Sequence, residues 1–210
     1  MGTSPPATPA HRLLSESGLG SSRELIDVAR VSSLLQSRYQ LAGDLQPLAT
    51  EKDDTFRLRT HPTDYLVKVS SPDETQAVVG LQTAAMRFLE ATAPELPVQR
   101  VELTVDGCDN VVVQADDGSV RVLRVFGFVE GVVWARAVPD GEQLAKVGTM
   151  LGCVDVAFKA FAHPADRRDL VWDIRHFHEL TELRAHTQNA EHRRLADAVF
   201  RLCRCAFEEE

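Results

Sequence analysis

Two kinds of hydrophobic pattern follow one another along this chain of 210 residues, and their order limits the architectures that it can adopt. Between residues 44 and 128, apolar and β-branched residues occur in short runs, which are typical of strands. After residue 131, apolar residues recur every three or four positions, which is the spacing of amphipathic helices. Strands that precede helices, instead of alternating with them, predict an α+β fold or two lobes.

The strand-rich block predicts an antiparallel sheet of about five strands, with one helix inserted after the third. That helix follows Pro72, which is tolerated in the first turn of a helix. The sequence DDG at 116–118 predicts a hairpin turn. The strand segments are DLQPLAT (44–50), TFRLRT (55–60), YLVKVS (65–70), PVQRVELT (97–104), NVVVQA (110–115) and SVRVLRVFGF (119–128).

Composition divides the chain into three parts. Residues 1–20 are rich in Pro, Ser, Thr, Gly and Ala and predict a disordered tail. Residues 21–128 contain the sheet and, before it, a helix predicted to start at a capping box of Ser21 and Glu24 and to end near Tyr39. Residues 129–210 contain a linker and a helical part, with helices predicted over 140–162, over 171–186 and from 190 onward.

Charge and composition argue against several classes of function. The chain has 31 acidic and 23 basic residues, a net charge of −8, and no basic stripe, so a nucleic-acid partner is not expected. No run approaches 18 apolar residues, and the N-terminus has no apolar segment typical of a signal peptide, so no membrane partner is expected. The four cysteines, which have no metal-site spacing, predict free thiols and a cytoplasmic location: Cys108, Cys153, Cys203 and Cys205.

Lys68 lies within the apolar segment YLVKVS, where an aliphatic residue would pack better. Alternation along a strand places it on the same face as Leu66 and Ser70. One interpretation is a lysine on a solvent-facing strand or at a sheet edge, where lysine also blocks pairing with other chains. The other is a lysine that binds phosphate from a rigid strand, with the polar turn TEKDD (50–54) between the first two strands closing over the phosphates. For Asp53 and Asp54 themselves, the sequence predicts a solvated turn.

Five segments in order resemble the aminoglycoside phosphotransferase-like kinases, and most of all the hydroxylysine kinase branch, which is also found fused to class III aminotransferases. The resemblance covers about residues 38–177. The segments are TEKDDTFRLRT (50–60), YLVKVSSPDETQAVVGLQTAAMRFL (65–89), VRVLRVFGFVEG (120–131), KVGTMLGCVDVAFKAFAHP (146–164) and RRDLVWDIRHF (167–177).

The resemblance implies a kinase-like N-lobe, of about five strands and one helix, and a partial helical C-lobe. It implies transfer of a phosphoryl group from ATP or GTP to a small hydroxylated amine or amino acid. Lys68 would bind the phosphates, with Gln82 at the position where the common kinase pattern has a glutamate, and Glu74 as an alternative partner. The remaining nucleotide contacts would come from the loop, through Thr50 and Lys52, and from the linker, through Phe126, Gly127 and Phe128.

The family's H-G-D motif, whose aspartate orients the acceptor hydroxyl, has no counterpart among the seven histidines. Asp166, Asp169 and Asp173 are predicted to have surface or capping roles, and His176 and His178 to diverge on a helix. We therefore expect a C-terminally incomplete kinase that binds nucleotide weakly, uses Mg only with the rest of the C-lobe, and is close to catalytically silent. The alternative is a non-catalytic binding or docking module, with a downstream aminotransferase domain or self-association through exposed helix faces.

Overall fold

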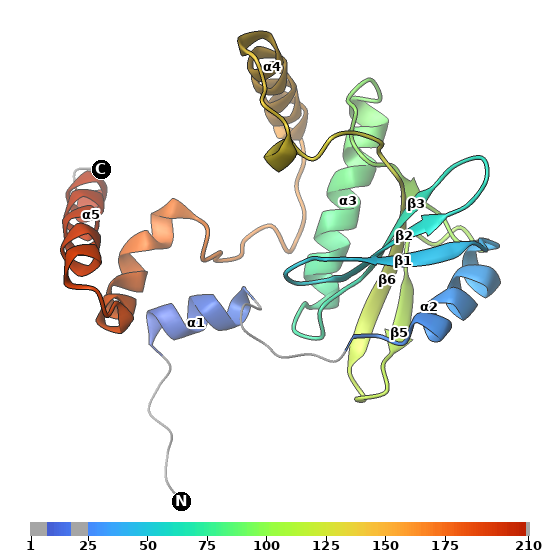
Figure 1. Ribbon diagram of the computed structural model, residues 1–210, viewed down its shortest axis with the longest axis horizontal. Helices are drawn as coiled ribbons and strands as arrows, with labels where there is room; N and C mark the ends of the chain where they lie inside the picture. The colour runs from blue at the N-terminus through green and yellow to red at the C-terminus, as the bar shows by residue number, and fades with distance from the viewer. Residues whose placement is uncertain (1–7, 18–24, 209–210) are drawn as a thin grey trace, which may run out of the picture. The chain divides into compact units, whose positions relative to one another are not determined.

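The computed structural model, which describes residues 8–17 and 25–208, contains one antiparallel sheet (Figure 1). Its neighbouring strands run in the order β1-β2-β3-β6-β4, and β5 pairs with β6 as well. Each predicted strand segment contains a strand, so the predicted α+β sheet is confirmed. The strands are β1 (Asp44–Leu48), β2 (Asp54–Arg59), β3 (Tyr65–Val69), β4 (Val101–Glu102), β5 (Val111–Gln114) and β6 (Val120–Gly127).

The register between β3 and β6 decides which side chains share a face of the sheet. Val67 lies opposite Val125, and Lys68 lies opposite Arg124. Directly opposed residues point to the same side, and successive residues alternate. One face is therefore apolar at this pair of strands, and the other carries two cations side by side.

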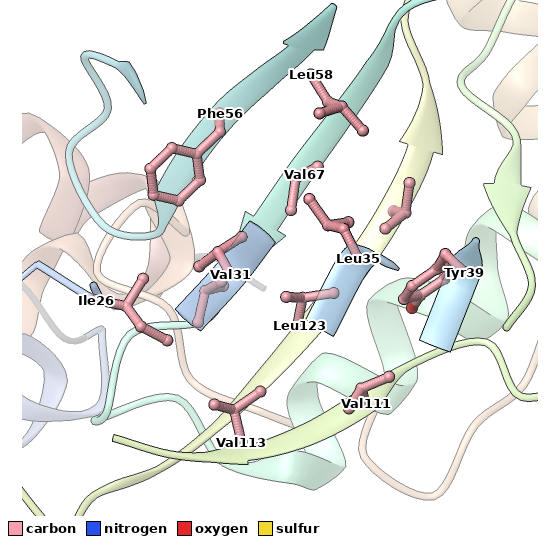
Figure 2. Close-up of a cluster of buried hydrophobic side chains, with 12 residues drawn as sticks. Ile26, Val31, Leu35, Tyr39, Phe56, Leu58, Val67, Val111, Val113 and Leu123 are labelled. Carbon is pink, nitrogen blue, oxygen red and sulfur yellow. The ribbon is translucent and has the colours of Figure 1, made fainter. Parts of the chain in front are cut away.

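The apolar face packs against α2 (Val28–Leu34) and the π-helical turn η1 (Leu35–Tyr39), as Figure 2 shows. The helix begins at Val28 because Asp27 accepts hydrogen bonds from the backbone N–H groups of Ala29 and Arg30. The predicted capping box at Ser21 and Glu24 lies outside the described residues. The fully or nearly fully buried residues of this core are Ile26, Val31, Leu35, Tyr39, Phe56, Leu58, Val67, Val69, Val111, Val113, Leu123 and Val125.

Helix α3 (Gln76–Thr92) lies on the other side of the sheet from α2 and contacts β4 and β6 (Figure 1). Thr75 caps its N-terminus by accepting a hydrogen bond from Val78 N. After β6 come a 3₁₀ turn, η2 (Trp134–Arg136), and α4 (Gly141–Phe158), which Asp140 and Gln143 cap reciprocally.

Helix α4 packs on α3 through aromatic rings. The ring centroids of Phe88 and Phe158 are 6.4 Å apart, and those of Phe88 and Phe161 are 5.3 Å apart. Leu89 and Leu96 are buried in the same cluster. The described residues 25–166 therefore form one compact unit, which extends past the predicted boundary at 128.

The second compact unit contains α1 (Pro9–Glu16), the 3₁₀ segment η3 (Ile174–His186) and α5 (Ala190–Glu208). The predicted disordered tail is wrong for α1, because Ala10 and Leu13 are fully buried. Phe177 of η3 stacks on Phe200 of α5 with ring centroids 4.5 Å apart. Segment 171–186, predicted as an amphipathic helix, forms 3₁₀ turns over Ile174–His186.

Several apolar helix residues remain exposed within these units. Phe158 packs in the cluster described above, but Leu151 is 58% exposed, and Leu195 and Leu202 are 65% and 71% exposed. The expectation that these faces meet another chain remains a prediction. None of the described helices combines the length and the apolar character that a membrane span requires.

Gly43, which directly precedes β1, provides a test of the β1–β2 pairing. A Cβ at this position would lie 2.0 Å from the backbone oxygen of Arg59, so the strand must shift to accept it. We expect Gly43→Ala to lower the free energy of unfolding by about 1–3 kcal/mol, in the range of other overpacking substitutions. The midpoint of urea unfolding measures this loss.

The matched control is Gly80→Ala in α3, where a Cβ meets nothing within 4 Å. Alanine has a higher helix propensity than glycine, so this variant should gain up to about 1 kcal/mol. Equal stability of Gly43→Ala and the wild type would show that β1 is not held against β2 at this register.

Candidate functional site

Lys68 lies in the interior of the sheet, because β3 pairs with β2 on one side and β6 on the other. Its two cross-strand neighbours are Thr55 and Arg124. A position at a sheet edge, one part of the first interpretation, is therefore wrong. The side chain is 35% exposed, so the ammonium group is available to a ligand while its stem packs on the sheet.

The loop between β1 and β2 directs an acidic side chain towards Lys68. Thr50 Oγ1 donates a hydrogen bond to the backbone oxygen of Asp53 at 2.5 Å and lies 3.3 Å from Thr55 Oγ1. Within this turn, Asp53 Oδ2 lies 3.7 Å from Lys68 Nζ, and its side chain is only 16% exposed. The prediction that Asp53 belongs to a solvated turn is therefore wrong.

The predicted partners of Lys68 have other positions. Glu74, whose side chain is 6% exposed, forms an ion pair with Lys52 of the β1–β2 loop. Gln82 is exposed on α3, and within the described part of the chain no hydrogen bond joins it to Lys68. The negative charge beside Lys68 thus comes from the loop residue Asp53 and not from the helix.

Arg124 is a site residue that the sequence analysis missed. It is 2% exposed, and its Nη2 lies 3.8 Å from Asp53 Oδ2. Burial lowers the pKa of its guanidinium, and the charges of Asp53 and Glu74 oppose that effect. The sequence does contain a signal for Arg124. Like Lys68, it is a cation inside an apolar strand segment, SVRVLRVFGF, where an aliphatic residue would pack better.

Asp54 points to the opposite face from Asp53 and serves the fold. Its carboxylate is fully buried, lies 2.7 Å from Arg121 Nη2 and accepts a hydrogen bond from Ile26 N at 3.0 Å. Arg121 also donates from Nε to Ser70 O at 2.6 Å. The predicted solvated turn is wrong here too, because this ion pair joins β2, β6 and the segment before α2.

The predicted linker residues lie at the end of β6 and just after it. Phe126 is buried. The amide of Gly127 donates to Arg100 O at 2.9 Å, and that of Phe128 donates to Asp64 O at 3.0 Å. Both N–H groups are thus used within the protein, so a nucleotide base would have to bind other groups of the linker in this conformation.

Arg57 holds the start of the linker. Its guanidinium lies 4.0 Å from the centroid of the Phe128 ring and forms ion pairs with Asp64 and Glu130. The hydrogen bond from Arg57 is the main cause that lowers the pKa of Asp64. This charge cluster fixes the direction in which the chain leaves the sheet.

A cavity of about 370 Å³ borders the β1–β2 loop. Leu25, Leu48 and Phe56 give it apolar walls, and Thr50 and Asp53 also line it, but Lys68 does not. The loop therefore borders both this cavity and the cation face of the sheet.

Asp166, Asp169 and Asp173 were predicted to have surface or capping roles, and the structure gives them such positions. Asp166 is exposed, and Asp169 forms an ion pair with Arg12 at 2.9 Å. Asp173 caps η3, and Arg175 is the main cause that lowers its pKa to about 2. His176 Nδ1 lies 2.7 Å from Glu179 Oε1. In the described part of the chain, no three His, Cys, Asp or Glu side chains come together as a metal site.

Comparison with known proteins identifies the family of this chain and solved structures with a similar fold. A model of the phosphotransferase enzyme family, APH, matches residues 44–208. A search of curated proteins found no match. Among solved structures, the chain is similar to amicoumacin kinase hAmiN in complex with AMP-PNP, Ca²⁺ and Ami, with a TM-score of 0.58 and 13% sequence identity. The similarity covers 78% of this chain and 55% of that one.

Two further kinases have the same fold. A microcompartment-associated aminopropanol kinase gives a TM-score of 0.56 at 18% identity, over 71% of this chain and 46% of that one. Spectinomycin phosphotransferase, in complex with ADP and spectinomycin, gives a TM-score of 0.50 at 11% identity, over 83% of this chain and 57% of that one. The chain thus spans about half the length of these kinases, and the similarity establishes a kinase-like fold.

Proposed function

Because the chain belongs to the phosphotransferase enzyme family, we propose that it forms the nucleotide-binding part of a small-molecule kinase. The observation that carries this proposal is the position of Lys68. It is a half-buried cation on an internal strand of a kinase-like sheet, next to the loop that joins β1 and β2. A cation fixed on a rigid strand is suited to the phosphates of ATP or GTP.

The role of these residues in the proposed reaction is to hold and neutralise the nucleotide. Phosphoryl transfer depends mainly on positioning and on charge stabilisation, with little covalent chemistry for the protein to perform. Lys68 would contact a phosphate oxygen, and the loop with Thr50 and Lys52 would cover the phosphates. Gln82, exposed on α3, would contribute less than Lys68 because it has no charge.

We propose a hydroxyl group of a small amine or amino acid as the acceptor. The similar aminopropanol kinase is named for an amino alcohol, and the sequence resembles the hydroxylysine kinase branch. The net charge of −8 is compatible with a cationic acceptor, although charge alone does not select one. An associated class III aminotransferase domain belongs to the same proposal.

The resemblance implies a magnesium ion bound together with the nucleotide. The described residues, however, do not bring together His, Cys, Asp or Glu side chains that could bind this ion. No step is therefore derived through the metal. The H-G-D motif has no counterpart among the seven histidines of this chain, so no residue is proposed as the base for the acceptor's proton. The 210-residue chain alone is proposed to bind nucleotide without measurable transfer.

Titration calorimetry with ATP, GTP and adenosine tests this proposal. We expect a Kd of about 0.1–1 mM for the nucleotides, equivalent to about 4–5.5 kcal/mol, because one lysine without metal gives only weak affinity. Adenosine, which lacks phosphates, should bind at least about tenfold more weakly. Equal affinity for ATP and adenosine would contradict the role of Lys68 in binding phosphate. Rapid phosphoryl transfer to hydroxylysine would contradict the expected lack of activity and would make Asp166, Asp169 and Asp173 candidates for a catalytic role.

A non-catalytic docking module is the second candidate. The observation that favours it is the exposure of apolar residues in α4 and α5, including Leu151 and Leu202. Such a module needs no affinity for nucleotide phosphates. The same titration therefore separates the two candidates.

A further inference from the structure

The face of the sheet that carries Lys68 contains a second cation, Arg124, whose hydrogen bonds are not satisfied. Arg124 is 2% exposed, and its guanidinium lies 5.6 Å from the centroid of the Phe126 ring. Its Nε atom is buried and unpaired. Burying a charge without hydrogen bonds is costly, and buried arginines normally donate several. This residue therefore needs an explanation beyond packing.

Lys68 and Arg124 are directly opposed across β3 and β6. Like charges at directly opposed positions repel one another, so the pair requires an anion. That anion is Asp53, whose Oδ2 lies 3.7 Å from Lys68 Nζ and 3.8 Å from Arg124 Nη2. Both distances exceed the 2.7–3.2 Å typical of N–H···O hydrogen bonds. One carboxylate oxygen thus lies between the two cations without bonding closely to either.

The other nearby charges do not replace Asp53. Glu74 contributes to the field at Arg124, but it forms an ion pair with Lys52. Asp109 also acts on Arg124 at longer range and accepts a hydrogen bond from Asn110. The anion position between Lys68 and Arg124 is therefore occupied by Asp53, which reaches it from a surface loop.

We propose that Lys68 and Arg124 form one anion subsite for a polyphosphate, and that Asp53 is an internal occupant which the phosphate displaces. The proposal rests on the function proposed above and deepens it by adding Arg124 and Asp53 to the site. A phosphate group has several charged oxygens, so it can accept a hydrogen bond from the guanidinium and from the ammonium at the same time. The loop carboxylate forms ion pairs with the two cations at 3.7 and 3.8 Å, but not at hydrogen-bond distance.

Displacement of Asp53 requires the loop to move. The turn is closed by the hydrogen bond from Thr50 Oγ1 to the backbone oxygen of Asp53. The exchange of a carboxylate for a phosphate thus couples binding to loop opening. Asp53 lowers the apparent affinity for nucleotide, because the phosphate must compete with it.

The test compares Asp53→Asn, Arg124→Lys and Lys68→Ala by calorimetry, with ATP and with inorganic pyrophosphate as probes. We expect Asp53→Asn to tighten the binding of both probes about three- to tenfold, since it removes a competing charge. Arg124→Lys keeps the charge but loses the planar fork, and should weaken both about fivefold or more. Asp116→Asn, at an exposed acid (78%), is the control for net charge and should change neither.

The outcomes separate this inference from the proposed function. If Asp53→Asn weakens binding or leaves it unchanged, Asp53 positions Lys68 and does not compete, and the inference is overturned. If Lys68→Ala leaves ATP affinity unchanged, the proposed nucleotide-binding function is contradicted, and the inference that rests on it is contradicted with it. If pyrophosphate binds Asp53→Asn tightly while ATP does not bind, the anion subsite stands without the nucleotide function. Urea unfolding of Arg124→Lys shows whether that variant keeps its fold.

Discussion

Replacing Arg121 by methionine is expected to lower the free energy of unfolding by about 3–5 kcal/mol. The substitution leaves the carboxylate of Asp54 fully buried without its cation, which lies 2.7 Å away in the wild type. It also removes the hydrogen bond from Arg121 Nε to Ser70 O. A loss of this size is a large part of the stability of a small domain, so the urea midpoint should fall markedly.

Two further variants make this prediction specific. Adding Asp54→Asn to Arg121→Met removes the buried negative charge and keeps an acceptor for Ile26 N, so the double variant should recover part of the loss. Arg30→Met, at an exposed ion pair with Asp116, should cost less than about 1 kcal/mol. A single variant as stable as the wild type would show that this pair does not hold the sheet together.

Lys68→Ala is expected to weaken ATP binding by about 10- to 100-fold, which corresponds to the 1.5–3 kcal/mol of a hydrogen bond to a charged group. Lys68 Nζ is partly exposed and lies on the interior strand β3, so its removal should affect the ligand more than the fold. This loss implies a Kd in the millimolar range. NMR chemical-shift changes during an ATP titration can measure such a Kd.

The matched control is Lys146→Ala on α4. Lys146 is 72% exposed and pairs with Glu142 one turn away, so its loss changes the net charge equally but leaves the cation face intact. ATP affinity should stay within about twofold of the wild type, since exposed charges at a distance are screened. Similar losses for Lys68→Ala and Lys146→Ala would point to general electrostatic attraction and not to a site.

The sheet was predictable because its strands carry their own local signals. Segment YLVKVS is rich in β-branched and aromatic residues, and DDG at 116–118 specifies a turn, so both could be located without knowledge of the rest. Helix α4 was predicted for the same reason, through the three- and four-residue spacing of its apolar residues. The family resemblance then indicated which strand lysine matters.

The partners of the charged residues could not be predicted, because they depend on register and on loop shape. Alternation shows that Asp53 and Asp54 point to opposite faces, but not that one meets Lys68 and the other Arg121. Helix α1 was missed because its composition favours disorder, while its burial comes from contacts with η3, far away in the sequence. These contacts exist only once the chain has folded.

The central claim is that nucleotide phosphates bind at Lys68 and Arg124. The most direct measurement is a crystal structure of the chain with AMP-PNP bound. The account predicts a phosphate oxygen within hydrogen-bond distance of Lys68 Nζ and of the Arg124 guanidinium, about 2.7–3.2 Å, with Asp53 displaced. Phosphates bound elsewhere, for example in the cavity lined by Leu25 and Phe56, with Asp53 still between the two cations, would contradict it.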